Sequence, residues 1–506
     1  MNSKVLFVLT LICYVASFGN AAVTMPNVFS DHMVLQQGKP ISVWGWAEPY
    51  ESVTVDFKGI TKKTTAGSEG RWDVELPAFE ASSESAQLRI EATNTVVISD
   101  ILVGEIWICS GQSNMEWNLN SAETGAKAVA AANFPQIRLL KINSRPCAWA
   151  VRDIDNKWLV CSPQTVGDFT AIGYFFGKHL HEELSVPVGL IQAAWGGTRI
   201  EPWIPREGFE QVDALVNIVR HIDQAHKNYR ENLPVKMLEI EKWINEARKA
   251  LKIGKTIPLQ PEWPRHSLYS EGHPTEPTCL YNSRIFPIVP LTHRGAIWYQ
   301  GESNIGEGML YYDKMKALIG GWRAVFGQSD LSFYYVQLAP YRHYGSDALP
   351  AIWEAQTAAL GIPNTGMVVI NDIGNIEDIH PRNKRDVGDR LALWALAKNY
   401  GRGNLVYSGP LYRSMAVKGD KIEITFDHVG PGLTTRDGKT PDWFEIAGSD
   451  KLFRPAQVRI VSDKVEVWSD EVSAPVAVRF AWDNIAQPNL MNKAGLPASA
   501  FRTDKW

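Results

Sequence analysis

The chain has 506 residues, 45% of them hydrophobic, and a formal net charge of −4. At about 100 to 200 residues per domain, this length predicts two to four domains with an ample buried core. The near-neutral charge argues against a nucleic-acid partner, because no basic excess is available to neutralise phosphates. The 19 tryptophans and 16 tyrosines could stack on sugar rings, although most rings of this kind belong to a core.

The first 22 residues have the pattern of a secretory signal peptide. Lys4 precedes the apolar run Val5–Val15, and small residues follow. We therefore expect an exported protein, periplasmic or extracellular. A lipid anchor on Cys13 is disfavoured because Ile12 is bulky where a small residue is needed. No other apolar run reaches the roughly 18 residues of a membrane helix, so no membrane span is expected.

Without the signal, four cysteines remain: Cys109, Cys147, Cys161 and Cys279. Cys147 and Cys161 are close enough in sequence to form a disulfide, whereas Cys109 lies in an apolar run and is expected to be a free core thiol. No Cys-x-x-Cys or His-x-x-x-His spacing suggests a metal site. Neither a metal nor a cofactor is therefore expected.

The pattern of apolar and polar residues predicts three regions after the signal peptide. Residues 23–100 alternate apolar and polar side chains between turn residues, which is typical of an antiparallel β sandwich. Residues 101–402 alternate apolar strands with helical stretches. Residues 403–506 return to period two and predict a second β module.

In the middle region, the order strand, helix, strand predicts a parallel sheet with right-handed crossovers. Helices are expected at Phe169–Leu184 and Arg385–Asn399. An insertion at about 206–278 contains two charged amphipathic stretches, Phe209–Tyr229 and Val235–Leu251, followed by a proline-rich loop. We expect two helices there and a segment that overhangs the functional site.

A serine follows the first buried strand of this region. The run from Gly104 to Cys109 is apolar on both faces, and Gly111 frees the backbone to turn before Ser113. An isolated serine after a glycine more often caps a helix. At the carboxyl end of a parallel strand, however, a serine stands where open α/β sheets place their chemistry.

Three further polar turns follow other strands of the predicted sheet: Gly196–Thr198, Gln300–Asn304 and Glu377–Pro381. Parallel strands bring their carboxyl ends to one edge, so these turns are expected to meet. Ester cleavage needs a base for the serine, donors for the oxyanion and a carboxylate to orient the base. A histidine, a glycine N–H, an asparagine amide and acidic residues are all present in these turns.

In chain order, Ser113, Gly197, Asn304 and His380 resemble the four signature residues of the SGNH hydrolase superfamily. The closer resemblance is to its sialate O-acetylesterase family. The matching motifs are Gly-Gln-Ser-Asn-Met-Glu at 111–116, Trp-Gly-Gly-Thr at 195–198, Trp-Tyr-Gln-Gly-Glu-Ser-Asn at 298–304 and Asp-Ile-His-Pro at 378–381, with further matches near both ends of the mature chain.

This resemblance implies a three-layer αβα SGNH fold with a parallel sheet, flanked by β-sandwich-like modules. It implies a metal-free serine esterase that removes acetyl groups from O-acetylated sugars, above all sialic acids, through an acetyl-serine intermediate. Ser113 matches the nucleophile and contributes its own N–H to the oxyanion hole. Gly197 matches the backbone donor, with Gly196 as the alternative, Asn304 the side-chain donor and His380 the base.

The acid that orients the histidine is left open. The superfamily's Asp-x-x-His spacing falls on Glu377, whereas Asp378 is one residue later. We rank Asp378 first and Glu302 second, beside a dyad in which backbone carbonyls hold His380. Gln112 and Arg199 are candidate substrate contacts, with structural hydrogen bonding as an equal alternative.

Three other functions have to be weighed. A glycosidase needs two paired carboxylates, for which the candidates are Glu105, Glu116, Glu201 and Glu302. A non-catalytic carbohydrate-binding protein would use the β modules and aromatic residues. A xylan or pectin deacetylase would keep the serine chemistry, whereas a sialate esterase would pair the sugar's carboxylate with an arginine such as Arg199, Arg284 or Arg342.

Overall fold

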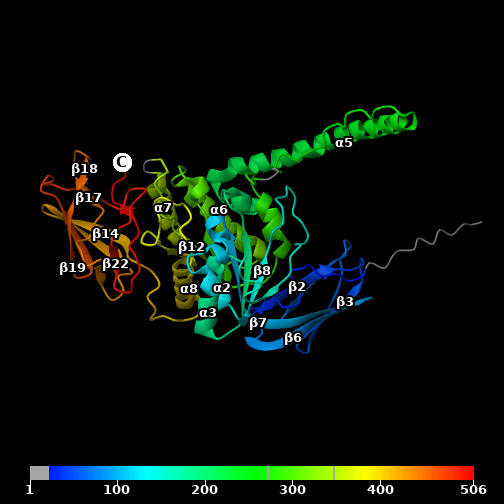
Figure 1. Ribbon diagram of the computed structural model, residues 1–506, viewed down its shortest axis with the longest axis horizontal. Coiled ribbons are helices and arrows are strands. Elements are labelled where there is room, and N and C mark those ends of the chain that lie inside the picture. Colours follow the sequence, from blue (N-terminus) through cyan, green and yellow to red (C-terminus); the bar gives the residue numbers. More distant parts are fainter. Residues whose placement is uncertain (1–21, 270–272, 346–347) are drawn as a thin grey trace, which may run out of the picture.

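The computed structural model describes residues 22–269, 273–345 and 348–506. The predicted signal segment, apart from residue 22, lies outside this part of the chain. Figure 1 shows blue N-terminal strands on one side, a sheet with helices in the middle and orange C-terminal strands on the other side. No helix of the described ranges is long and apolar enough to cross a membrane.

The middle region is built on the carboxyl-terminal half of one long strand, β7. Its neighbours are parallel to one another except for β9, which is antiparallel to β8. The order across this part of the sheet is β13 (Thr365–Val368), β12 (Ser332–Val336), β11 (Gly295–Tyr299), β7 (Thr95–Gly111), β10 (Val188–Ala194), β8 (Phe134–Lys141) and β9 (Leu159–Cys161). Every residue of β10 is buried, as expected for a parallel strand covered on both faces.

Helices cover the two faces of this sheet. On one face, Trp107 of β7 packs edge-on against Phe176 of α3 (Ala171–Leu184), with ring centroids 5.1 Å apart, and α8 (Arg385–Asn399) lies beside α3. On the other face, Trp298 packs against Trp322 of α6 (Leu310–Phe326), beside α4 (Arg206–Glu210) and α7 (Ala348–Ala358). The short α2 (Gly125–Ala130) precedes β8.

The N-terminal strands and the parallel strands form one mixed sheet, because β7 belongs to both. The predicted boundary at residue 100 therefore falls inside a single strand. Along β7, exposed and intermediate residues give way to an unbroken buried run, so the sequence texture marks a change in burial rather than the end of an element. The other strands of this module are β1 (Val34–Gln36), parallel to β7; β3 (Ser52–Phe57), β4 (Ile60–Thr65) and β6 (Ser82–Glu91), antiparallel; and the pair β2 (Ile41–Trp46) and β5 (Arg71–Leu76).

The C-terminal strands form two four-stranded sheets and one pair. The first sheet contains β14 (Leu411–Lys418), β15 (Lys421–Asp427), β20 (Lys464–Trp468) and β19 (Gln457–Val461); the second contains β18 (Phe453–Pro455), β17 (Phe444–Ala447), β21 (Ala477–Phe480) and β23 (Phe501–Arg502); the pair is β16 (Leu433–Thr435) and β22 (Leu490–Asn492). Phe426 of the first sheet packs edge-on against Phe501 of the second, with ring centroids 5.8 Å apart. Aromatic packing thus joins the two sheets.

The insertion differs from its prediction as two helices. One continuous helix, α5 (Val216–Lys252), spans the predicted break and contains Pro234; Figure 1 shows it projecting from the body of the molecule. A proline normally interrupts a helix by leaving the carbonyl of residue i−4, here Arg230, without a donor. Pro234 is exposed, so water can satisfy that carbonyl and the helix continues.

The cysteines do not pair as the sequence allowed. Cys147 and Cys161 are both free thiols, as are Cys109 and Cys279. The backbone N–H of Cys147 instead donates to the carbonyl of Cys279 at 3.0 Å.

Candidate active site

Three of the predicted polar turns begin at one edge of the sheet. The last residues of β7, β10 and β11, namely Gly111, Ala194 and Tyr299, are in register with one another. At Gly111 the backbone has φ of 138°, and a Cβ there would lie 2.1 Å from the carbonyl oxygen of Tyr299. Only glycine fits this turn, which delivers Ser113 as the first residue of the short helix α1 (Ser113–Glu116).

Ser113 and His380 lie within hydrogen-bond distance, although 267 positions separate them in the chain. The Oγ atom of Ser113 is 2.8 Å from Nε2 of His380. The imidazole comes from the loop between β13 and α8, and the indole of Trp117 stacks on it with ring centroids 5.1 Å apart and an interplanar angle of 24°. The fold therefore brings the predicted nucleophile and the predicted base together.

The three candidate acids differ in their distance from the imidazole. Oδ1 of Asp378 is 3.9 Å from Nδ1 of His380, within ion-pair range but too far for a hydrogen bond; the same oxygen accepts the backbone N–H of His380 at 2.9 Å. Glu377 is exposed and pairs with Arg342 at 2.7 Å. Glu302 accepts a hydrogen bond from Asn114 at 2.6 Å and has no contact with His380 among the described residues.

The surroundings of His380 favour its neutral form. Burial lowers the pKa of the imidazole, and the nearby Lys384 ammonium lowers it further, whereas the Asp378 carboxylate acts to raise it. The net direction is downward from the ordinary value of 6.5. A neutral imidazole can accept the proton of a serine hydroxyl.

Two backbone N–H groups of the predicted oxyanion hole have no acceptor among the described residues. Neither the N–H of Ser113 nor that of Gly197 has a hydrogen-bond partner in the part of the chain that the structure describes. The N–H of Gly196 is different, because it donates to Oε2 of Glu116 at 2.6 Å. Of the two glycines that the sequence left open, Gly197 is the one with a free donor.

Asn304 does not present its amide to the serine. Its Nδ2 atom donates to Oε2 of Glu201 and to Oε2 of Glu307, both at 3.1 Å. Its Oδ1 atom accepts from the backbone N–H of Ile200 at 3.0 Å and from Gln300 at 2.8 Å. The fully buried side chain is therefore hydrogen-bonded within the protein at both its oxygen and its nitrogen, and its role as an oxyanion donor stays a prediction.

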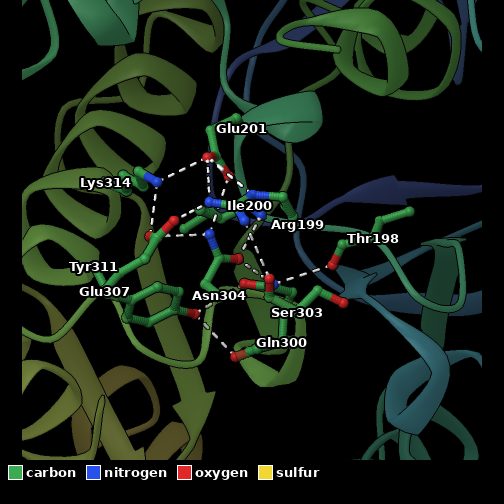
Figure 2. A network of polar contacts seen from close by, with 10 residues as sticks. All are labelled: Thr198, Arg199, Ile200, Glu201, Gln300, Ser303, Asn304, Glu307, Tyr311 and Lys314. Carbon is green, nitrogen blue, oxygen red and sulfur yellow. Dashed lines mark hydrogen bonds and ion pairs between the residues drawn. The ribbon is translucent and has the colours of Figure 1, made fainter. Parts of the chain in front are cut away.

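Asn304 belongs to a buried ionic network that joins the loop after β10 to the loop after β11 (Figure 2). The ammonium of Lys314 donates to Glu201 and Glu307, each at 2.7 Å. Burial acts to raise the pKa of Glu201, but Lys314, Asn304 and Arg199 together hold that pKa below the ordinary value. Arg199 also binds both carboxylates, so this candidate substrate contact is engaged within the protein.

Gln112 is likewise enclosed, with 3% of its surface exposed. Its side-chain amide lies within hydrogen-bond distance of backbone groups of Thr198, Gly301 and Ser303. The structural alternative stated for Gln112 therefore describes its observed contacts.

Several residues of the site had not been predicted. Trp117 stacks on the base, Glu116 holds the glycine loop, and the buried Lys384 contacts Asn114 beside the nucleophile. The first two adjoin the serine motif, and this proximity was a usable signal. Lys384 follows His380 by four positions in a polar stretch, where nothing distinguishes it from a surface lysine.

The four carboxylates considered for a glycosidase pair are all bound within the protein. Their partners are Arg294 for Glu105, Gly196 for Glu116, Lys314 for Glu201 and Asn114 for Glu302. The hydroxyl of Ser113 and the imidazole of His380, in contrast, lie within hydrogen-bond distance of each other.

Known proteins resemble the chain over nearly its whole length. The family described as "Carbohydrate esterase, sialic acid-specific acetylesterase" matches residues 103–236 and 278–396. A carbohydrate acetylesterase from Xanthomonas citri is 35% identical, with 96% of this chain and 100% of that chain covered and a TM-score of 0.79. Sialate O-acetylesterases of Rattus norvegicus and Homo sapiens are 28% and 29% identical over 94% of this chain and 92% and 90% of theirs.

The gap between the two segments of the family match, residues 237–277, falls within the insertion, and the segments contain the serine, glycine, asparagine and histidine motifs. The chain therefore belongs to the sialic acid-specific acetylesterase family of carbohydrate esterases and is a carboxylic ester hydrolase.

Proposed function

We propose that the chain removes O-acetyl groups from acetylated carbohydrates, with Ser113 as nucleophile and His380 as general base. The observation that carries this proposal is the 2.8 Å distance between Oγ of Ser113 and Nε2 of His380. The superfamily's three-layer αβα fold, export behind a signal peptide at residues 1–22, and units at 23–100, 101–402 and 403–506 are parts of the same proposal.

The reaction has two halves. His380 accepts the hydroxyl proton of Ser113 as Oγ attacks the acetyl carbonyl carbon, and the oxyanion forms beside the N–H groups of Ser113 and Gly197. The carbonyl then re-forms, and the sugar oxygen leaves with the proton from His380. Water, deprotonated by His380, next attacks the acetyl-serine and releases acetate. Two backbone donors replace the three predicted, because Asn304 is bound to carboxylates.

Asp378 acts in this scheme through charge. At 3.9 Å from Nδ1, its carboxylate stabilises the imidazolium that forms during each half-reaction, and its bond to the backbone N–H of His380 holds the loop. Because no direct hydrogen bond joins the two side chains, the arrangement is a dyad with an electrostatic partner rather than a tight triad.

The class of sugar depends on whether an arginine is available to bind the carboxylate of a sialic acid. Arg199 binds Glu201 and Glu307, Arg342 binds Glu377, and Arg284 is buried with its guanidinium on backbone carbonyls. O-acetylated sialic acids are the first substrate class proposed, in line with the names of the family and relatives. Xylan-type and pectin-type acetyl esters are the second candidate class, and the engagement of all three arginines favours xylan within it, because the xylose units of xylan carry no carboxylate.

Acetate release tests the proposal. Wild-type protein is expected to cleave an aryl acetate and an O-acetylated sugar, and Ser113→Ala to lose both activities. Ser121→Ala is the serine control, because Ser121 is an exposed residue of the short 3-10 helix after α1. Full activity of Ser113→Ala would contradict the assignment. Turnover of O-acetylated sialic acid compared with acetylated xylan then decides between the two substrate classes.

A further inference from the structure

A lysine is buried directly behind the reactive pair. Lys384, the residue before α8, is 1% exposed. Its Nζ atom donates to Oδ1 of Asn114 at 2.5 Å and lies over the rings of Trp117 and Tyr299, at 5.5 Å and 5.8 Å from their centroids. Asn114 follows the nucleophile in the chain, and Trp117 stacks on the base. The Lys384 ammonium therefore contacts one residue beside the proposed nucleophile, Asn114, and one residue stacked on the proposed base, Trp117.

Asn114 extends this contact across the site. Its Nδ2 atom donates to Oε1 of Glu302 at 2.6 Å and to the backbone carbonyl of Ile379 at 3.0 Å. Ile379 immediately precedes His380. One asparagine side chain thus joins the nucleophile helix, the loop of the base and the buried acid, and Lys384 is hydrogen-bonded to its oxygen.

We propose that Lys384 is a positioning residue that fixes the serine helix against the histidine loop through Asn114 and, as a buried cation, keeps His380 neutral and able to act as a base. The inference rests on the proposed function, because it concerns the same two reactive groups. It assigns a role to a side chain that touches neither the substrate nor the reacting atoms.

The charges around these groups agree with that role. His380 faces Asp378, Lys384, the hydroxyl of Ser113 and the uncharged ring of Trp117. Burial and then Lys384 lower the pKa of the imidazole, and Asp378 opposes them. A buried cation near the ring makes the imidazolium unfavourable, so the neutral base persists at weakly acidic pH.

Lys384 itself faces Glu302, Asp378 and the ring of Tyr299. Burial lowers the pKa of its ammonium to about 7, against the opposing pull of the two carboxylates. The positive charge is therefore present below neutrality, in the pH range where His380 would otherwise take up a proton.

Two variants separate the contact from the charge. Lys384→Gln keeps a donor for Asn114 but removes the charge, whereas Asn114→Ala removes the link between the serine helix and the histidine loop. Lys398→Gln is the control, because Lys398 belongs to α8 and also lies over an aromatic ring, that of Tyr407 at 4.4 Å, away from the motifs. The measurement is the pH profile of kcat/KM for an aryl acetate, together with kcat.

For Lys384→Gln, the acidic limb of the profile is expected to move to higher pH by about one unit, the ordinary spread of histidine pKa values in proteins. For Asn114→Ala, kcat is expected to fall by roughly 100-fold, the cost of a small misplacement of reacting groups. The control should match the wild type. An unmoved limb in Lys384→Gln, or wild-type kcat in Asn114→Ala, would overturn the inference. Absence of acetate release by the wild type would instead refute the proposed function.

Discussion

Asn304 offers the sharpest test of how this site is built, because two assignments of the same side chain predict opposite results. As an oxyanion donor, Asn304 would affect the rate and leave the fold unchanged. As the clamp seen here, it holds together the loops that follow β10 and β11 (Figure 2). The perturbation is Asn304→Ala.

The structure sets the size of the effect. The substitution removes two hydrogen bonds to carboxylates at 3.1 Å and two bonds to Oδ1 at 3.0 Å and 2.8 Å, all in a fully buried position. Each buried group left without a partner costs about 1 to 3 kcal/mol. Lys314 and Arg199 still neutralise the two carboxylates. We therefore expect the free energy of unfolding to fall by roughly 3 to 5 kcal/mol, which is less than the sum over all four hydrogen bonds.

The assay combines thermal unfolding with aryl acetate hydrolysis well below the melting temperature. Asn304→Ala is expected to have a markedly lower melting temperature. It is also expected to lose activity, because the glycine loop is no longer held in place. Asn492→Ala is the control, since Asn492 is also fully buried and bonds the backbone carbonyls of Ser408 and His428 in the C-terminal region; it should lower stability without lowering kcat. Wild-type stability of Asn304→Ala with a 100- to 1,000-fold lower kcat would refute the clamp and restore the oxyanion donor.

Three further results are expected. The acidic limb of kcat/KM should lie below pH 6.5, because burial and Lys384 lower the pKa of His380 and activity is lost as the pH falls through that pKa; a limb above 6.5 would contradict this. Asp378→Asn removes the charge that raises the same pKa, so the limb should move to still lower pH while kcat falls by about 10-fold, far less than the roughly 10⁴-fold of a directly bonded triad acid. Gly111→Ala should lower the melting temperature, since a Cβ would meet the carbonyl of Tyr299 at 2.1 Å and a strained backbone of this kind costs about 1 to 3 kcal/mol; an unchanged melting curve would show that the turn can relax.

The strand ends could be predicted because the signal for them is local. Val188–Ala194 is an almost continuous apolar run followed by a polar turn, and it forms β10. The helix predicted at Arg385–Asn399 likewise has the bounds of α8. Parallel strands place their carboxyl ends on one edge, so the meeting of the serine and glycine turns followed from topology alone.

The prediction of a break within α5 failed for a different reason. Pro234 predicts a helix end by its own chemistry, but the outcome depends on whether the freed carbonyl meets protein or water. Here α5 projects from the body of the molecule (Figure 1), so the carbonyl meets water. The local sequence does not contain that information. The residue pattern also changes near residue 100. This change reflects the increasing burial along the single strand β7.

The role of Asn304 depended on partners far away in the chain. A motif gives the type of side chain at a strand end, but an amide donates to whichever acceptor lies within reach. Here Glu201 and Glu307 occupy both of its donors, and Glu201 is 103 positions away. Only the folded arrangement of the three loops decides between a bond to the oxyanion and a bond to a carboxylate.

The proposed reactive groups lie outside the strands. Ser113 and Gly197 follow the last residues of β7 and β10 by two and three positions, and His380 lies in the loop between β13 and α8, where the sheet does not fix the backbone. Catalysis nevertheless needs them placed to within about 0.5 Å. Two buried lysines supply the missing restraint, Lys314 behind the glycine loop and Lys384 behind the serine and histidine. An exposed ion pair would contribute little there, because water competes for it, whereas a buried ammonium must keep its partners or lose its charge. The rigidity of this site therefore follows from the cost of leaving those lysines unpaired.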